Sequence, residues 1–116
     1  MKIKLAGIVA IANACLLDTT QEACGVIDGY NVVPLENCST EPESSFMISA
    51  EDFLKYEPNT IYHSHPTSDN GFSEHDLVVA ANLQLTSYVY VVESDRLERF
   101  TPTTGVEVFE NVLSKS

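Results

Sequence analysis

Basic residues and long apolar runs are both scarce in this sequence. It has only 6 lysines and arginines against 17 acidic residues, a formal net charge of -11. This excess of acid repels phosphate backbones, so nucleic acid is not an expected partner. A helix that spans a membrane needs about 18 or more consecutive apolar residues, and the sequence contains no such run. No membrane-spanning segment is therefore expected.

Cysteine is also sparse, with Cys15, Cys24 and Cys38 as the only three. Their number is odd and their spacing matches neither a zinc finger nor a C-x-x-C motif. Free thiols in a reducing cytosol are the simplest interpretation, which favours a cytoplasmic protein, although a disulfide between two of them stays open. At 44% hydrophobic residues, the chain can bury a core without disulfides. Its 116 residues predict one domain over 1–116.

The N-terminal stretch has two lysines followed by an apolar run, a pattern that resembles a secretory signal. Its alanine-asparagine-alanine motif at 12–14 would, however, leave a signal shorter than the usual range of about 15–30 residues. Apolar residues also recur there at helical spacing. We therefore predict an amphipathic or buried first helix over residues 3–17.

Further elements follow from turn residues, caps and β-rich runs. Asp28-Gly29 is a strong hairpin signal, Ser49 and Ser73 are N-cap candidates, and Pro66 ends a strand. The expected strands are 22–27, 30–35, 46–49, 60–65, 87–92, 96–101 and 105–111, with the last two paired at an edge of the sheet. The expected helices are 49–56 and 73–84, and the expected loops are 37–45 and a flexible segment, 67–72. This order predicts an α/β domain with a mixed sheet.

All three histidines lie within residues 61–76, in the stretch IYHSHPTSDNGFSEHD. Successive side chains of a strand point to opposite faces, so His63 and His65 are expected to share one face while Tyr62 and Ser64 share the other. Two imidazoles on one face can meet a single ion. Catalytic zinc takes three protein ligands at about 2.0–2.2 Å and leaves one position for water. The pair therefore needs a third ligand.

Asp76 is the leading candidate for that ligand, because it lies in the first turn of the next helix. Asp69 and His75 compete with it, the former on the loop and the latter pointing about 100° away around the helix. The plainer interpretation is that Ser73 and Asp76 form a capping box and that the histidines lie on a solvated edge. The joint spacing of H-x-H-P, six residues, then S-x-x-D favours the metal site.

This spacing, with Glu22 upstream, resembles the JAMM motif of the JAB1/MPN/Mov34 metalloproteases. The match covers Glu22, His63, His65, Ser73 and Asp76 without departure in type or spacing. The resemblance implies the JAB1/MPN fold, a cytidine-deaminase-like three-layer α-β-α sandwich with a mixed sheet.

The resemblance also implies the role of each residue. His63, His65 and Asp76 would bind Zn²⁺, which lowers the pKa of a water and polarises the scissile carbonyl. Glu22 would carry the proton of that water to the leaving amine, and Ser73 would donate toward the developing oxyanion. The implied activity is that of a zinc metallopeptidase or isopeptidase.

A second pattern is formed by Asn37, Pro42, Phe46 and Ile48, and it is similar to the bacterial and phage branch, especially the JAMM domain of phage tail-tip assembly proteins. There the domain usually precedes a cysteine peptidase domain, which this sequence lacks. The resemblance suggests a ubiquitin-like or phage tail protein as substrate, in the host cytoplasm if the protein is phage-encoded. The alternative is a non-catalytic MPN-type assembly module. A zinc nucleoside deaminase is set aside, because its H-x-E and P-C-x-x-C motifs are absent.

Overall fold

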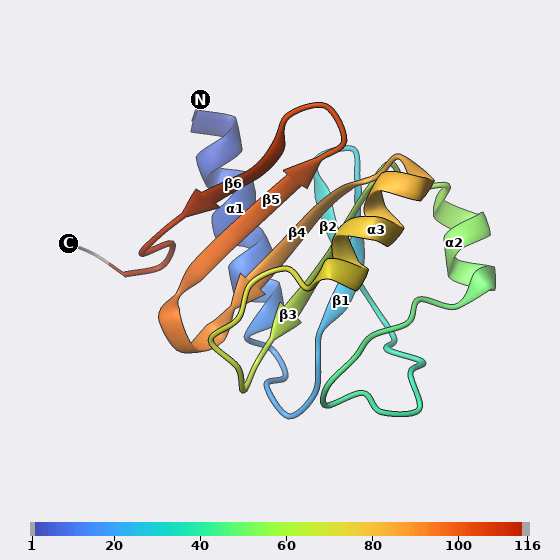
Figure 1. Cartoon of the computed structure of the whole chain (residues 1–116), viewed down its shortest axis with the longest axis horizontal. Coiled ribbons are helices and arrows are strands. Elements are labelled where there is room, and N and C mark those ends of the chain that lie inside the picture. The colour runs from blue at the N-terminus through green and yellow to red at the C-terminus, as the bar shows by residue number, and fades with distance from the viewer. Residues whose placement is uncertain (1, 115–116) are drawn as a thin grey trace.

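The computed structural model describes residues 2–114 and shows helices on both faces of one sheet (Figure 1). The elements in chain order are α1 (Lys2–Cys15), β1 (Cys24–Asp28), β2 (Asn31–Leu35), α2 (Ala50–Tyr56), β3 (Thr60–His65), α3 (Glu74–Leu83), β4 (Thr86–Val91), a 3₁₀ turn (Val92–Ser94), β5 (Arg96–Thr101) and β6 (Gly105–Phe109).

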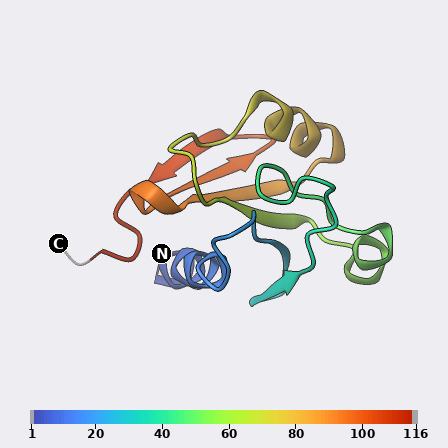
Figure 2. The ribbon, with the colours of Figure 1, turned by 90° about the horizontal axis from the view of Figure 1, so that it is seen from below.

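The sheet is mixed, with strand order β2-β1-β3-β4-β5-β6. Only β3 and β4 are parallel, and α3 provides the connection between them. The other neighbouring pairs are antiparallel and are joined by hairpins or, for β1 and β3, by the longer segment that contains α2. Figure 2 shows α1 on one face of the sheet and α3 on the other. The predicted three-layer α-β-α sandwich with a mixed sheet is confirmed.

One half of the core lies between α1 and the sheet. The helix contributes Ile8, Ile11, Ala12 and Cys15, which recur at helical spacing and are all buried. They form a cluster with buried residues of three central strands, namely Tyr62, Tyr90 and Leu97. The predicted first helix is thus confirmed, although it ends at Cys15 rather than at residue 17.

The opposite face of the sheet carries a second cluster, built on Val26, Ile61 and Leu85. Ile61 and Tyr62 are neighbours in β3 yet belong to different clusters, as the alternation of a strand requires. Gly25 in β1 allows a close approach, because a Cβ atom there would lie 2.2 Å from the carbonyl oxygen of Val33. The face with the second cluster is also the one that carries the histidines.

One of two predictions for the region around the start of α2 is wrong. Residues 46–49 do not form a strand, because they have no neighbouring strand to pair with. Their backbone is held instead by a hydrogen bond from the Cys38 amide to the Met47 carbonyl, at 2.8 Å. The predicted short helix with Ser49 as its cap is confirmed, since the Ser49 side chain accepts from the Asp52 amide.

Other predictions hold in the described part of the chain. All three cysteines are free, with Cys15 and Cys24 buried and Cys38 exposed. Within residues 2–114, no helix has the length and apolar character needed to cross a bilayer.

Asp95 connects the β4–β5 turn to the C-terminal segment. It adopts a left-handed conformation, with φ 52°, and its carboxylate accepts from the Tyr90 hydroxyl at 2.6 Å. The backbone amides of Leu113 and Ser114 donate to the same carboxylate at 2.9–3.1 Å. Desolvation would raise the pKa of Asp95, but these hydrogen bonds outweigh it and lower the pKa below its usual value.

Asp95→Asn is expected to lower the free energy of unfolding at neutral pH, because the donors lose a charged acceptor. Asparagine tolerates the left-handed backbone, so the variant removes the charge and one of the two acceptor oxygens without straining the turn. Because the pKa of Asp95 is lower in the folded protein, its ionised carboxylate stabilises the fold fully at pH values above the unfolded pKa of about 3.9. This contribution to the free energy of unfolding is lost as the pH falls through the native pKa. Urea unfolding at about pH 7 and about pH 3 should therefore show that the difference in unfolding free energy between wild type and Asp95→Asn is smaller at the lower pH. Asp28→Asn, at the exposed last residue of β1, is the control. A difference in unfolding free energy between wild type and Asp95→Asn that widens in acid would contradict the assignment.

Candidate metal centre and active site

The two histidines lie at the end of β3, in the middle of the sheet. His63 is paired with Cys24 of β1 on one side and with Val89 of β4 on the other, and it is 1% exposed. The His65 side chain is 13% exposed. The two rings lie 5.0 Å apart, centroid to centroid. The prediction that both imidazoles project from one face of the strand is confirmed.

His63 is buried without a hydrogen-bond partner for either ring nitrogen among the described residues. Phe46 stacks on its ring at 4.3 Å, with an angle of 18° between the ring planes. Desolvation lowers the pKa of His63 and outweighs the attraction of the Asp76 carboxylate, so the imidazole is held neutral. A buried neutral imidazole with an unsatisfied nitrogen is costly unless an ion or another group takes that position.

His65 is oriented by the loop that follows it. Its Nδ1 atom lies 2.8 Å from the carbonyl oxygen of Asn70. A carbonyl can only accept, so the hydrogen of the neutral ring lies on Nδ1 and Nε2 keeps a free lone pair. This is the arrangement that metal-binding histidines commonly show, in which the second ring nitrogen donates to a protein oxygen.

Ser73 and Asp76 form a capping box at the start of α3. The Asp76 amide donates to Ser73 Oγ and the Ser73 amide donates to Asp76 Oδ2, each at 3.0 Å. The same Oδ2 atom lies 3.3 Å from Nε2 of His63 and 3.9 Å from Nε2 of His65. The capping box and the approach to the histidines are therefore compatible rather than alternative.

The charge of Asp76 is well supported by its neighbours. Desolvation would raise the pKa of its carboxyl group, but His63 and the hydrogen bonds from Ser73 lower it far below its usual value. Asp76 is thus ionised. One oxygen of its carboxylate faces the Nε2 atoms of both imidazoles, at 3.3 and 3.9 Å.

Glu22 enters the site from the segment between α1 and β1. Its backbone amide donates to the Pro42 carbonyl at 2.7 Å, and its own carbonyl accepts from the Asn37 side chain at 2.9 Å. The next residue, Ala23, exchanges hydrogen bonds with both the side chain and the amide of Ser64, at 2.9 Å each. These bonds anchor the Glu22 backbone on two sides, so its side chain has a defined direction.

The Glu22 side chain is 7% exposed, and one of its oxygens lies 3.9 Å from Nε2 of His65. Desolvation, followed by the charge of Asp76, raises the pKa of Glu22 to about 7. A carboxyl group with a pKa near neutrality can both accept and release a proton. No other acid at this site combines such burial with that position.

The donor atoms fit a four-coordinate metal ion. Ligands at about 2.0–2.2 Å from a tetrahedral zinc ion are separated from each other by roughly 3.4 Å. The Asp76 oxygen meets this separation closely with His63 and loosely with His65. Glu22, His63 and His65 also offer donor atoms within 4.8 Å of one another. The imidazoles are common to both sets, so the geometry supports a metal site with either carboxylate as its third group.

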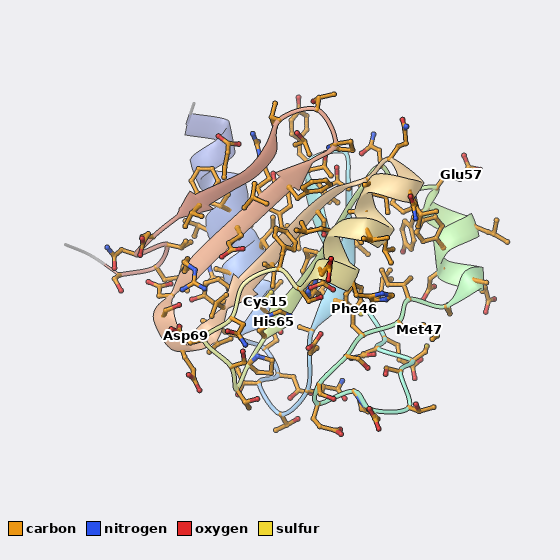
Figure 3. All side chains as sticks on the ribbon, in the orientation of Figure 1. Cys15, Phe46, Met47, Glu57, His65 and Asp69 are labelled. Atoms are coloured by element: carbon orange, nitrogen blue, oxygen red, sulfur yellow. The ribbon has the colours of Figure 1, made fainter. Side chains whose placement is uncertain are left out.

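The two competing candidates lie elsewhere. Asp69 is 69% exposed and faces Arg96 Nη1 at 3.7 Å. Figure 3 shows it on the far side of the loop from Phe46, with His65 between them. His75 is exposed on α3 and lines the cleft in front of the site.

The site opens into a cleft of about 990 Å³. Its histidines and Asp76 lie where β3 ends and α3 begins, and most of the rest of its lining combines apolar and small polar side chains. The apolar wall is formed by Phe46, Ile48, Phe53, Val79, Leu83 and Leu85. None of the side chains that line this cleft is a lysine or an arginine.

Asn37 is a structural residue whose role the sequence did not reveal. Its amide nitrogen donates to the carbonyls of Glu22, Pro42 and Ser45, at 2.9–3.3 Å. Its oxygen accepts from the amides of Ser39 and Met47. One buried amide thus joins Glu22 to the irregular segment that carries Phe46. Asparagine is a common loop residue, so only its partners identify this role.

Comparison with known proteins gives a family and a fold. A family model described as prokaryotic homologs of the JAB domain matches residues 6–103. The solution structure of a protein from Desulfitobacterium hafniense is similar, with a TM-score of 0.63 and 19% sequence identity, over 90% of this chain and 86% of that chain. At this identity the likeness supports the fold alone. No curated protein matches the chain.

Asn37→Ala is expected to lower the free energy of unfolding by about 2–4 kcal/mol, because each buried group left without a partner costs about 1–3 kcal/mol. Denaturant unfolding followed by circular dichroism measures the change. Asn82→Ala is the control, since that side chain is exposed on α3 and should change stability by less than about 0.5 kcal/mol. Equal effects of the two substitutions would contradict the role of Asn37.

Proposed function

The chain belongs to the family of prokaryotic homologs of the JAB domain, and we propose that its cleft is the active site of a zinc-dependent peptidase or isopeptidase. The observation that carries the proposal is the convergence of four groups in one open cleft. Two imidazoles from β3 and the Asp76 carboxylate from α3 face each other, and the buried Glu22 lies beside them.

His63, His65 and Asp76 would hold the zinc ion. Asp76 is preferred to Glu22 as the third ligand because one of its oxygens faces both Nε2 atoms, at 3.3 and 3.9 Å. When bound, the ion supplies Lewis acidity, which lowers the pKa of a water and polarises a scissile carbonyl. The capping box holds Asp76 in place, and the Asn70 carbonyl holds His65.

Glu22 then remains as the general acid–base group. Its anchored backbone directs the carboxylate toward His65, where it could take a proton from the attacking water and pass it to the leaving amine. Ser73 would donate to the developing oxyanion. The Ser73 oxygen accepts a hydrogen bond from the Asp76 amide through a lone pair, so the hydroxyl hydrogen is still free to donate to the oxyanion. Loss of such a donor typically costs about 3 kcal/mol of transition-state stabilisation.

The cleft suits a protein or peptide substrate. It is open at the surface, and its apolar wall could receive side chains on either side of the scissile bond. A ubiquitin-like or phage tail protein stays a prediction from the sequence resemblance. The cytoplasmic location likewise stays a prediction from the sequence.

We expect protein purified without chelator to carry about one zinc ion per chain, measured by mass spectrometry. His63→Ala and Asp76→Ala should lose it, because each removes one of three ligands. His75→Ala, which changes an exposed histidine of the same cleft, should keep it. Circular dichroism of every variant shows whether the fold persists. Folded wild-type protein that binds no zinc at micromolar concentration would contradict the peptidase and favour an assembly module.

Glu22→Gln is expected to keep zinc and to lose hydrolysis by about 10²–10⁴-fold, because the amide cannot take the proton. The assay is cleavage of a mixed peptide library, read by mass spectrometry. Glu43→Gln is the matched control, an exposed acid on the rim of the cleft. Zinc-loaded wild type and Glu22→Gln with equal cleavage would rule out Glu22 as the acid–base group.

A further inference from the structure

The loop over residues 67–72, between β3 and α3, is held by strand β5. Sequence analysis predicted a flexible connection here. Instead, Nη2 of Arg96 donates to the Asp69 carbonyl at 2.9 Å, and the Phe72 amide donates to the Glu98 carboxylate at 3.1 Å. Nε of Arg96 also donates to Glu98, at 3.3 Å. The Arg96–Glu98 ion pair on β5 therefore holds the loop by hydrogen bonds to two residues, Asp69 and Phe72.

Gly71 is part of the same arrangement. A Cβ atom at this position would lie 2.0–2.2 Å from atoms of the Glu98 carboxylate. Any other residue would displace that carboxylate, and with it the bond to the Phe72 amide. The glycine is thus needed for the close approach of the loop to the strand.

The loop in turn reaches His65 through one backbone group. Asn70 lies between Asp69 and Phe72, the two residues that β5 holds. Its carbonyl oxygen lies 2.8 Å from Nδ1 of His65. The Asn70 side chain is exposed, and within the loop its amide is held only by Ser68 Oγ. Without the hydrogen bonds from Arg96 and Glu98, the loop that carries the Asn70 carbonyl would be exposed and weakly held, and it could adopt many other conformations.

We propose that Arg96 and Glu98 are positioning residues for His65. They hold the loop so that the Asn70 carbonyl accepts the Nδ1 hydrogen, which directs the free lone pair of Nε2 into the site. A metal ligand whose other nitrogen is fixed in this way binds more tightly, since neither the ring direction nor the tautomer must be selected on binding. The inference rests on the metal site of the proposed function, but the state of the His65 ring is independent of it.

Arg96→Met and Gly71→Ala test the proposal from opposite sides. The first removes the cation that grips Asp69, and the second displaces Glu98 while leaving Arg96 in place. In metal-free, folded protein at a pH where the ring is neutral, ¹⁵N NMR of the imidazoles should show His65 as the Nδ1–H tautomer. Both variants should raise the population of the Nε2–H tautomer.

Zinc affinity is the second measurement, by competition with a chelating dye. Loss of an outer partner of a metal-binding histidine typically weakens binding 10–100-fold, and both variants are expected to lose at least about 10-fold. The His63 tautomer should not change, because its ring makes no contact with the loop carbonyl. Should Arg96→Met fail to fold, Gly71→Ala and Glu98→Gln carry the test.

Two control variants match these changes. Arg99→Met removes an arginine from the same strand, where its partner is Glu107 on β6. Asp69→Asn removes the side-chain ion pair with Arg96 but leaves the gripped carbonyl. Both should keep the wild-type tautomer and affinity.

The outcomes separate this inference from the proposed function. A wild-type His65 in the Nε2–H form, or variants with an unchanged tautomer and affinity, would overturn the positioning role. If His65 has the Nδ1–H tautomer in the wild type and shifts in the variants, the positioning role of Arg96 and Glu98 is supported even if no zinc binds. In that event the metal site, and not the role of Arg96 and Glu98, would be wrong.

Discussion

The alternation of side chains along β3 is the constraint on which the rest of the structure depends. This strand has neighbours on both sides, one antiparallel and one parallel. Tyr62 and Ser64 therefore point to the layer of α1, where Tyr62 fills the core and Ser64 binds the backbone beside Glu22. His63 and His65 point the other way, into the cleft. A slip of one residue in register would bury both imidazoles beneath α1 and expose the core.

The site is assembled largely by hydrogen bonds that also complete local structure. The Ser73–Asp76 capping box satisfies the first amides of α3 and at the same time directs a carboxylate oxygen at two imidazoles. Asn37 satisfies the carbonyls of an irregular segment and at the same time fixes the backbone of Glu22. Because each bond has both roles, the stability of these segments and the geometry of the site cannot vary independently.

The surroundings of the two carboxyl groups in the site shift their pKa values in opposite directions. Asp76 receives hydrogen bonds at a helix N-terminus, where negative charge is favoured, and it stays ionised. Glu22 lacks such donors for its carboxylate and is desolvated beside the charge of Asp76, so its pKa rises toward neutrality. Two acids in one site thereby acquire different chemistry. The same division between a permanently charged group and a proton carrier is found at many hydrolytic sites.

Sequence alone predicted most of the helices and strands and named the candidate residues of the site. Periodicity placed α1, the histidine pair on one face of a strand, and the cap at Ser73, because these features depend on neighbours within a few residues. It failed at residues 46–49, since a strand exists only where another strand pairs with it. It also failed at the loop over 67–72, where Arg96 and Glu98 hold residues that lie 27 and 26 positions away in the sequence.

Only the tertiary structure decided how these parts meet. The distance from Asp76 to the imidazoles, the burial of Glu22 and the connection from β5 through the Asn70 carbonyl to His65 all join segments that the chain folds together from afar. Residue types and spacing do not give the distances or the burial of such contacts, because the free energy of each contact depends on its surroundings and on the direction of a bond. The sequence thus named the chemical groups, and the packing of β3 against its neighbours set their directions.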